Sequence, residues 1–495
     1  MNFWVLGEDN LTPLEAAKIP NLDKITKSGL TGIHDPVQTN LAWGSDTAHM
    51  SLFDLDPFQL YDGRGAFETM GAGVNMEFNE IAFKWNFALI NDETDIVLKR
   101  RADREFSWGI SLWDQINGLR INEFLPQELK SVNYNVIWEY ATEHRWGIKI
   151  SGPNLVTTIS ELDPLKDNRK ISKWVPLEDT IESQITAKVV QATSDAIREW
   201  LSNHPINIER KNQGLTYTNV ILLRGCGKRF EASPFEHTHG LKSFMIAPTA
   251  IIKGIGMHLD FDIYDVQGAT GSYDSNYHNK LESAENLLQN EGYDFGFVHI
   301  KAIDDAGHDK NRELKIEMLE KVDEAIGKSI ERLGWNSQQH HFIMWVTGDH
   351  TTPVSLGDHT HEPVPFIIST AFAAYNASNI PINEEDVTFY EENDFIMHSM
   401  RDGVEKFDEI SCSYGALGRF QLKQSMNIVK GMKAKIEEIL QYFYNHSNEN
   451  SMEKLHEDIK DHGQNYLFTS LGSPIKSWSS KDIGKDSQSE LERIK

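Results

Sequence analysis

Hydrophobic positions along the chain alternate between short β-rich runs and longer helical patterns. The apolar runs at 220–223, 295–300 and 342–346 have the length and composition of buried strands. Between the last two, residues 314–333 repeat their apolar side chains with helical spacing. Strands that alternate with helices are typical of an α/β sheet, so we predict an α/β fold.

Two further helices and a tail are predicted near the chain ends. Thr12 can cap a helix that has Pro13 at its first position and runs to about Ser28. Residues 432–445 carry a second amphipathic pattern, which predicts a closing helix. The segment that follows, 446–495, is rich in Ser, Asn, Lys and Glu, and we expect it to be a loosely held C-terminal extension.

Composition narrows the class of protein. The 495 residues are 39% hydrophobic and 25% charged, which is typical of a globular chain of two domains. The formal net charge of −26 argues against general nucleic-acid binding, which needs a basic surface. The sequence has no run of about 18 apolar residues, which a membrane-spanning helix would need. The apolar run at its start is too short for a signal peptide. The two cysteines, Cys226 and Cys412, are far apart in the sequence and do not suggest a disulfide framework. We therefore predict a reducing, cytoplasmic location.

Polar clusters follow two of the predicted strands. Asp304 and His308 follow one strand, the pair Asp349-His350 follows the other, and a similar pair ends at His359. In open parallel sheets, ligand sites lie at the carboxyl ends of strands. Carboxylate and imidazole together suit Mn²⁺, Zn²⁺ and related ions, and two such ions about 4 Å apart can serve phosphoryl transfer. One such pair is weak evidence, but three together indicate a metal site.

Five segments give this pattern a family context. Over about residues 10–430 the chain resembles the archaeal-type cofactor-independent phosphoglycerate mutases of the alkaline phosphatase superfamily. The segments are GSDTAHMSLFDLDP (44–57), YDGRGAFETMGAG (61–73), HIKAIDDAGHD (299–309), TGDHTTPVSLGDHTHEPVP (347–365) and FDEISCSYGALGR (407–419). The resemblance implies an alkaline-phosphatase-like metal-binding domain with a parallel-rich central sheet, interrupted by an inserted α/β substrate domain. We expect the metal-binding domain at 1–75 and 235–445, and the inserted domain at 76–234.

The resemblance also implies a reaction and its catalytic residues. Ser45 is the expected nucleophile of a metal-dependent mutase that interconverts 3-phosphoglycerate and 2-phosphoglycerate through a phosphoserine intermediate, in glycolysis and gluconeogenesis. By the family pattern, Ser45 shares one divalent ion with two residues and three others hold a second ion. These ligands are Asp349 and His350 for the first ion, and Asp304, His308 and His359 for the second. A serine hydroxyl is a poor nucleophile until a metal or base lowers its proton affinity.

The cofactor and substrate sites follow from the same resemblance. We expect Mn²⁺, while Zn²⁺, Mg²⁺ and Co²⁺ also suit the site, and no bisphosphoglycerate cofactor is needed. Arginine recognises phosphate and carboxylate groups with two parallel hydrogen bonds. The basic residues that match family positions for holding this small-molecule substrate are Arg64, Arg145, Arg224 and Lys253.

The chain departs from the family pattern at its start. Family members begin with an apolar strand that ends in Asp-Gly, and its aspartate completes the serine-side metal site, but residues 1–9 contain no Asp-Gly. Three interpretations stay open: a start assigned too far downstream, a substitute ligand from Glu8 or Asp9, or an impaired homologue that serves as a structural subunit. Lys84 also stands where an arginine is more usual. Another phosphatase or phosphomutase of the superfamily is the alternative activity, and the oligomeric state stays undetermined.

Overall fold

The structure is a computed structural model that describes residues 10–102, 116, 119–142, 145–336, 342–377 and 400–445. The proposed substitute ligands Glu8 and Asp9 and the C-terminal extension therefore lie outside the described residues. The chain divides into two compact units, called unit 1 (Met1–Pro57 and Asp265–Glu492) and unit 2 (Phe58–Tyr264 and Arg493–Lys495). Unit 2 thus includes segments 58–75 and 235–264, whereas the resemblance implies that they belong to the metal-binding domain.

A mixed sheet forms the centre of unit 1. Its strand order is β10 (Ile343–Thr347), β11 (Val364–Thr370), β1 (Leu30–Asp35) and β12 (Gly418–Gln421). Strand β1 pairs parallel to β12, whereas β11 runs antiparallel to both β1 and β10. The α/β class is confirmed, and in the described pairings β10, β1 and β12 run in one direction while β11 runs in the other. The reason is the connection 348–363, which contains no crossover helix and so returns β11 antiparallel to β10.

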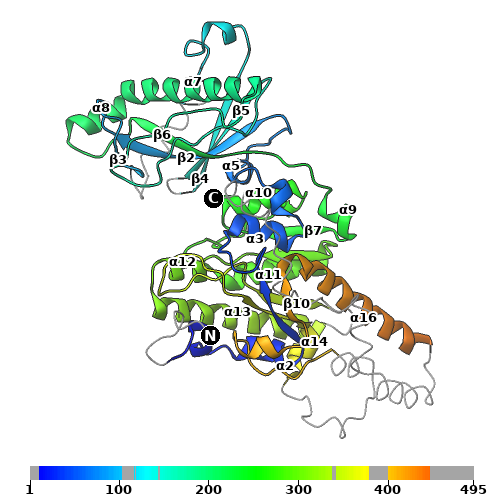
Figure 1. The fold of residues 1–495 in the computed structure, drawn as a ribbon. Helices are drawn as coiled ribbons and strands as arrows, with labels where there is room; N and C mark the ends of the chain where they lie inside the picture. The colour runs from blue at the N-terminus through cyan, green and yellow to red at the C-terminus, as the bar shows by residue number, and fades with distance from the viewer. Residues whose placement is uncertain are drawn as a thin grey trace. The chain divides into compact units, whose positions relative to one another are not determined.

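Helices cover both faces of this sheet (Figure 1). Successive residues of β11 point to opposite faces: Ile367 packs with residues of α2 and α13, while Phe366 and Ile368 pack with residues of α16. The other elements of unit 1 are α1 (Pro13–Ala16), α2 (Pro20–Lys27), α3 (Ser45–Leu52), α11 (Tyr277–Asn290), β9 (Phe295–Val298), α12 (Ala302–His308), α13 (Arg312–Asn336), α14 (Ala371–Tyr375), η4 (Ser411–Tyr414), η5 (Leu422–Gln424) and α16 (Ser425–Asn445).

Most predicted elements are present, with one difference near the start. The predicted strands at 295–300 and 342–346 correspond to β9 and β10, and the helices predicted at 314–333 and 432–445 lie within α13 and α16. The single helix predicted from Thr12 is wrong, because the chain forms α1 and α2 instead. Proline disfavours the helical conformation of the residue before it, and Ile19, before Pro20, has φ −123° and ψ 56°.

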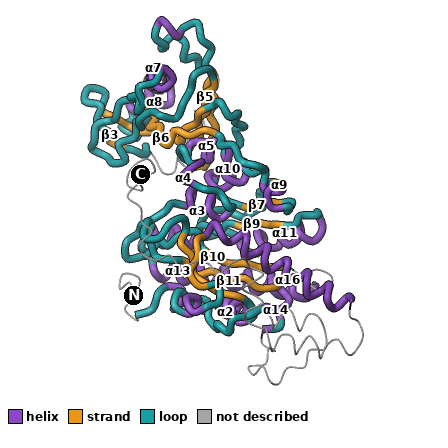
Figure 2. Tube along the Cα trace, turned by 45° about the vertical axis from the view of Figure 1, so that its right-hand side comes forward, coloured by secondary structure: helices purple, strands orange, loops and turns teal. Residues whose placement is uncertain are grey.

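An antiparallel sheet forms the centre of unit 2. Strand β2 (Ile81–Ile90) pairs with β5 (Arg145–Ser151) on one side and with β6 (Val220–Lys228) on the other, and β4 (Asn135–Thr142) pairs with β5. Helix α7 (Ile181–Asn203) covers one face of the sheet (Figure 2). The remaining elements are α4 (Pro57–Leu60) at the division between the units, α5 (Gly65–Gly71), β3 (Val97–Lys99), η1 (Gln127–Leu129), α8 (Pro205–Asn212), α9 (Phe235–His239), β7 (Ser243–Ile246), α10 (Ala250–His258) and β8 (Asp262–Ile263).

Close helix packing explains why 58–75 and 235–264 belong to unit 2. Helix α5 packs against β2, β5 and β6, and also against α10. A side chain at Gly71 would collide with the carbonyl oxygen of Ala250, and one at Gly254 would collide with that of Phe67. The two helices are therefore in backbone contact, and α10 is held in unit 2 through α5.

This contact predicts a large effect of one methyl group. We expect Gly71→Ala to lower the free energy of unfolding by about 2 kcal/mol, because two helix backbones must separate. Urea denaturation followed by tryptophan fluorescence measures it. Gly214→Ala is the control: it adds a methyl where no atom lies within 4 Å but at φ +69°, so only left-handed strain of about 1 kcal/mol is expected. Equal losses in the two variants would contradict the packing explanation.

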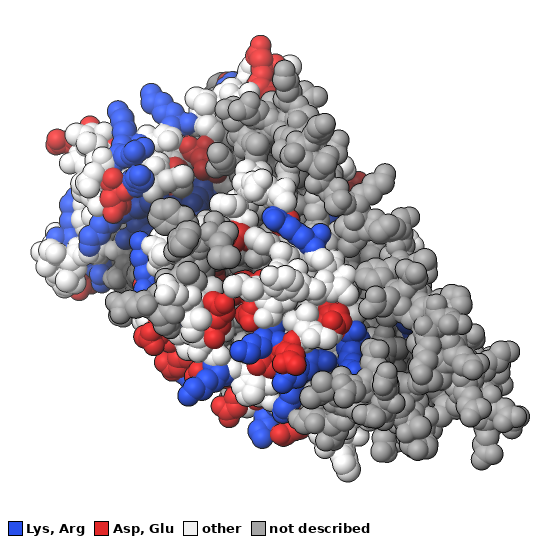
Figure 3. Space-filling model, turned by 60° about the horizontal axis from the view of Figure 1, so that its bottom comes forward, with Lys and Arg blue, Asp and Glu red and all other residues white. Residues whose placement is uncertain are grey.

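The described surface carries both signs of charge. On the face drawn in Figure 3, acidic and basic side chains lie close together over much of the described area, so the net charge of −26 does not form a single acidic patch there. Among the described helices, none combines the length and the apolar character needed to cross a membrane.

Candidate metal centre

Ser45 is the first residue of α3, directly after the helix cap Gly44. Its Oγ lies 2.9 Å from Nε2 of His350, and the side chain is half-buried. The first N–H groups of a helix have no intrahelical acceptors, and the helix dipole favours negative charge at that end. The fold therefore places this hydroxyl where an anion such as a phosphoryl group is stabilised.

Asp349 and His350 follow β10 and lie beside Ser45. Asp349 Oδ2 is 3.3 Å from His350 Nε2 and 3.5 Å from Nδ1 of His49, which lies one turn after Ser45 on α3. Burial by itself raises the pKa of Asp349, but the nearby imidazoles of His350 and His49 outweigh it and hold the pKa below the usual range. Asp349 therefore stays a carboxylate, which is the form that binds a cation.

Asp304 lies on α12, within the same unit. Its Oδ1 accepts a 2.5 Å hydrogen bond from Thr352 Oγ1, and its Oδ2 contacts the ammonium of Lys301. One helical turn later, His308 places Nε2 3.4 Å from Asp304 Oδ2. Burial raises the pKa of Asp304, yet the contacts with His308 and Lys301 lower it well below the usual range. This second carboxylate is also ionised.

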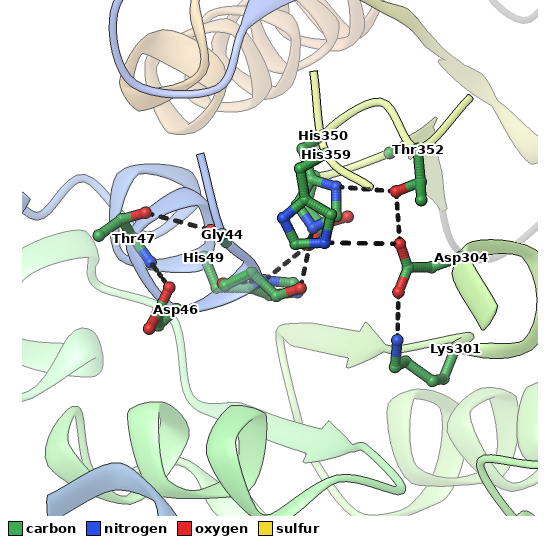
Figure 4. A network of polar contacts seen from close by, with 12 residues as sticks. Gly44, Asp46, Thr47, His49, Lys301, Asp304, His350, Thr352 and His359 are labelled. Carbon is green, nitrogen blue, oxygen red and sulfur yellow. Dashed lines mark hydrogen bonds and ion pairs between the residues drawn. The ribbon is translucent and has the colours of Figure 1, made fainter. Parts of the chain in front are cut away.

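His359 joins the two groups. Its ring centroid is 3.7 Å from that of His350 and 5.0 Å from that of His308. Figure 4 shows the His350 and His359 rings next to each other, with Asp304 and Thr352 to one side. Burial and the neighbouring His350 lower the pKa of His359 to about 4, so the ring is neutral at pH 7 and can donate a lone pair to a metal ion.

Two groups of side chains have ligand atoms close enough to hold one ion each. The first is Asp304, His350 and His359, and the second is His308, Asp358 and His359, with all ligand atoms of a group within 4.8 Å of one another. Ionised carboxylates and imidazoles whose ligand atoms converge in this way fit a divalent cation. The structure thus brings together Ser45 and all five predicted metal ligands, although Asp358 was not among the predicted ligands.

The predicted substrate-binding residues all lie in unit 2. Arg145 begins β5, but its side chain is outside the description, and Lys253 lies on α10. Arg64 and Arg224 are neighbours: Gly225 lies against the Arg64 side chain, and burial together with the charge of Arg64 lowers the pKa of Arg224. Like charges held close together without full solvation create a place for an anion.

A buried ion pair between Lys84 and Glu68 lies next to Arg64 and Arg224. Lys84 Nζ is 2.9 Å from Glu68 Oε1, and both residues are buried, at 5% and 2% exposure. The same Glu68 oxygen is 3.4 Å from Arg64 Nη2, and Lys84 is paired with Arg224 in the β2–β6 register. Glu68 therefore contacts both Arg64 and Lys84, and the charges of Asp163 and Glu161 also act on Arg224.

Sequence reasoning missed several residues of these networks. His49 and Thr352 contact the predicted ligands, and Glu68 with Lys84 supports Arg64. For His49 a signal existed, since it lies four residues after Ser45 in a helical segment. Glu68 had none, because its partner Lys84 is reached only through the packing of α5 on β2.

The chain is similar to several known proteins. A model of the Metalloenzyme superfamily matches residues 6–380. The 2,3-bisphosphoglycerate-independent phosphoglycerate mutase of Sulfurisphaera tokodaii is 37% identical over 373 residues, which cover 75% of this chain and 86% of the relative. A second relative with this description, mutase 1 of Methanocaldococcus jannaschii, is 33% identical over 424 residues, covering 86% and 93%.

Two solved structures share the fold. The cofactor-independent phosphoglycerate mutase of Thermoplasma acidophilum matches with a TM-score of 0.56 and 30% identity, covering 86% of this chain and 95% of that one. The PH0037 protein of Pyrococcus horikoshii matches with a TM-score of 0.64 and 26% identity, covering 86% and 92%. Membership of a metalloenzyme superfamily implies divalent-metal binding, and the Asp and His groups described above are the residues that fit it.

Proposed function

The chain belongs to the Metalloenzyme superfamily and, within it, to the 2,3-bisphosphoglycerate-independent phosphoglycerate mutases, and on this premise we propose that it interconverts 3-phosphoglycerate and 2-phosphoglycerate. The family predicted from the five sequence segments is thereby confirmed. The observation that carries the proposed reaction is the position of Ser45: its hydroxyl lies at the start of α3 and 2.9 Å from His350 Nε2, which is 3.3 Å from the Asp349 carboxylate.

We assign the residues of unit 1 to two ion positions. Ser45, Asp349 and His350 surround the first, and Asp304, His308 and His359 surround the second. Bound divalent ions lower the proton affinity of a serine hydroxyl and neutralise charge on the phosphoryl oxygens. Mn²⁺ is the ion we expect, since mixed carboxylate and imidazole ligands suit it.

The chain's own residues then perform two transfers. Ser45 Oγ, oriented by His350, attacks phosphorus, so the Oγ–P bond forms, the bond to the substrate's C3 oxygen breaks, and the proton of the serine hydroxyl passes to that departing oxygen. The C2 hydroxyl of the retained glycerate attacks the phosphoserine, which forms 2-phosphoglycerate and frees Ser45. Throughout, the first turn of α3 stabilises the phosphoryl charge with its N–H groups.

The glycerate must be held between the two transfers, because water would otherwise release free phosphate. Arg64, Arg145, Arg224 and Lys253 are the side chains we propose for this role. Arginine binds carboxylate with two parallel hydrogen bonds, and Glu68 with Lys84 keeps Arg64 in place. Small-molecule binding of this kind needs no nucleic-acid or membrane partner.

Removing one of these arginines is expected to weaken substrate binding and increase leakage. Arg224→Ala should raise KM by about tenfold or more, since a charge-assisted contact contributes about 1.5–3 kcal/mol. Released phosphate per turnover should also rise. Both are measured in one assay that quantifies 2-phosphoglycerate and inorganic phosphate. Arg198→Ala, which removes an arginine of unit 2 that forms ion pairs with Asp92 and Asp95, is the matched control and should leave both values unchanged.

A cytoplasmic location is part of the proposal. Both cysteines are buried free thiols, and burial raises the pKa of Cys226 and of Cys412, to about 12 for the latter. Unpaired, protonated thiols suit a reducing compartment. They also support a structural role for Cys412 and not a nucleophilic one.

A further inference from the structure

Strand β6 of unit 2 contains a β-bulge directly after Arg224. The register between β2 and β6 shifts at this point, so two residues of β6, Gly225 and Cys226, lie opposite one residue of β2. Gly225 has φ +64°, the left-handed conformation that is typical of the first residue of such a bulge. A bulge bends its strand and redirects the neighbouring side chain, so the direction of Arg224 depends on it.

The segment that carries Arg64 packs on the same bulge. An added Cβ would lie 2.3 Å from a carbonyl oxygen of the bulge at Gly63, and 2.4 Å from one at Gly65. Glycines on both sides of Arg64 therefore allow its backbone to lie against β6. The bulge thus sets the position of Arg64 relative to Arg224.

Glu161 binds the backbone of this bulge. Its Oε1 accepts a hydrogen bond of 2.8 Å from Gly225 N. A bulge removes one residue from the regular strand pairing, so an N–H group there needs an acceptor from outside the ladder. The Glu161 carboxylate supplies that acceptor, although the residue is exposed and 64 positions away in the sequence.

The two residues after Glu161 hold it in place. Leu162 N donates to the carbonyl oxygen of Leu223, the residue just before Arg224, at 3.3 Å. The Asp163 carboxylate is buried and accepts from Arg100 Nε at 2.7 Å and from Arg100 Nη2 at 2.6 Å. Two parallel hydrogen bonds between opposite charges fix both position and orientation. Segment 161–163 is therefore a firm support along this part of β6.

The guanidinium of Arg224 retains capacity for a ligand. Its Nε is buried and makes no hydrogen bond to any described residue. Burial, and then the charges of Arg64 and Arg100, lower the pKa of Arg224, while Asp163 and Glu161 act in the opposite direction. A buried donor without an acceptor costs free energy, which an anion bound at this point would recover.

We propose that Glu161 is a positioning residue: by accepting the Gly225 N–H group, it fixes the bulge that holds Arg224 ready to bind the carboxylate of the substrate. Glu161 acts through its hydrogen bond and not through its charge, since a second carboxylate near the arginine would weaken the binding of an anion. The inference rests on the proposed function, because it assigns Arg224 to the substrate.

Two substitutions of Glu161 test the proposal. Glu161→Gln keeps an oxygen acceptor for Gly225 N, whereas Glu161→Ala removes it. In the metal-loaded full chain, we expect Glu161→Ala to raise the KM for 3-phosphoglycerate about fivefold, as for the loss of one hydrogen bond, with kcat unchanged. Glu161→Gln should keep the KM of the wild type or lower it. Glu199→Ala, which removes another exposed glutamate of unit 2 from α7, is the control and should change neither value.

A double variant tests whether Glu161 acts through Arg224. Adding Glu161→Ala to Arg224→Ala should raise KM by less than about twofold further, because residues that act as one unit are not additive. Circular dichroism checks that each variant is folded. Equal KM values for Glu161→Ala and Glu161→Gln, or a full fivefold further increase in the double variant, would overturn the positioning role.

Calorimetric titration with 3-phosphoglycerate distinguishes this result from failure of the proposed function. A wild type that binds 3-phosphoglycerate but does not convert it would contradict the mutase reaction alone. Weaker binding by Glu161→Ala than by Glu161→Gln would then still support the positioning role, and equal Kd values would overturn it.

Discussion

Replacing Ser45 with alanine is expected to abolish mutase activity. The loss in kcat should be roughly 10⁴-fold or more, which is typical when a covalent nucleophile is removed. The physical reason is that Ser45 supplies the hydroxyl at the start of α3, 2.9 Å from His350 Nε2, and alanine leaves no oxygen there to form the bond to phosphorus. Interconversion of the two phosphoglycerates in the Mn²⁺-loaded full chain measures the effect.

The control and a second readout make this result specific. Ser51→Ala removes another hydroxyl from the same helix, and we expect activity within about threefold of the wild type, as for a substitution that adds or removes no catalytic contact. Mass spectrometry of the quenched wild type should detect one added phosphoryl group on the peptide that contains Ser45. Activity that survives in Ser45→Ala would exclude Ser45 as the nucleophile, and an inactive wild type would favour a structural subunit.

Loss of Asp349 is expected to have the second largest effect. The Asp349→Asn substitution removes a carboxylate that lies between His49 and His350, and with it the charge that attracts the serine-side ion. We expect kcat to fall by about 10²- to 10³-fold, as when one preorganised electrostatic contact is lost. Elemental analysis should find one metal ion fewer per chain. Chelation of the wild type should abolish activity, and Mn²⁺ should restore it.

An exposed aspartate provides the matched comparison. Asp274→Asn changes a side chain in unit 1 that accepts a hydrogen bond from Thr270 and belongs to neither metal group, so metal content and kcat should be those of the wild type. If Asp349→Asn retained full metal content and activity, the assignment of Asp349 to the serine-side ion would be wrong. A wild type that already binds a single ion would instead point to an incomplete serine-side site.

Local patterns predicted much of this fold correctly. Periodicity identified β9, β10, α13 and α16, because their apolar spacing directly reflects burial on one side of a helix or within a sheet. Periodicity did not predict the break at Ile19, although Pro20 was a visible signal. It also did not predict the direction of β11, because pairing direction depends on how the connection 348–363 returns to the sheet.

In the candidate site, too, some residues were predicted from the sequence, whereas the contacts that support them were not. Carboxylate and imidazole side chains near strand ends indicated a metal site, since ligand chemistry is a property of the residue types, and the resemblance then predicted the roles of Ser45, Asp304, Asp349 and the histidines. The supporting contacts were not recognisable, because they join residues far apart in the chain. Thr352 reaches Asp304 across 48 positions, and Lys84 reaches Glu68 only where α5 packs on β2.

By itself, then, the sequence determined the α/β class, which follows from local spacing, and the family, which follows from the resemblance of five segments; through that resemblance it also predicted Ser45 as nucleophile and a set of metal ligands. Only the tertiary structure decided that β11 runs antiparallel to β10, that α5 and α10 belong to unit 2, and that Asp358 stands beside His308 and His359. These features depend on contacts between distant segments, and such contacts are set by packing and loop geometry, which local spacing does not encode.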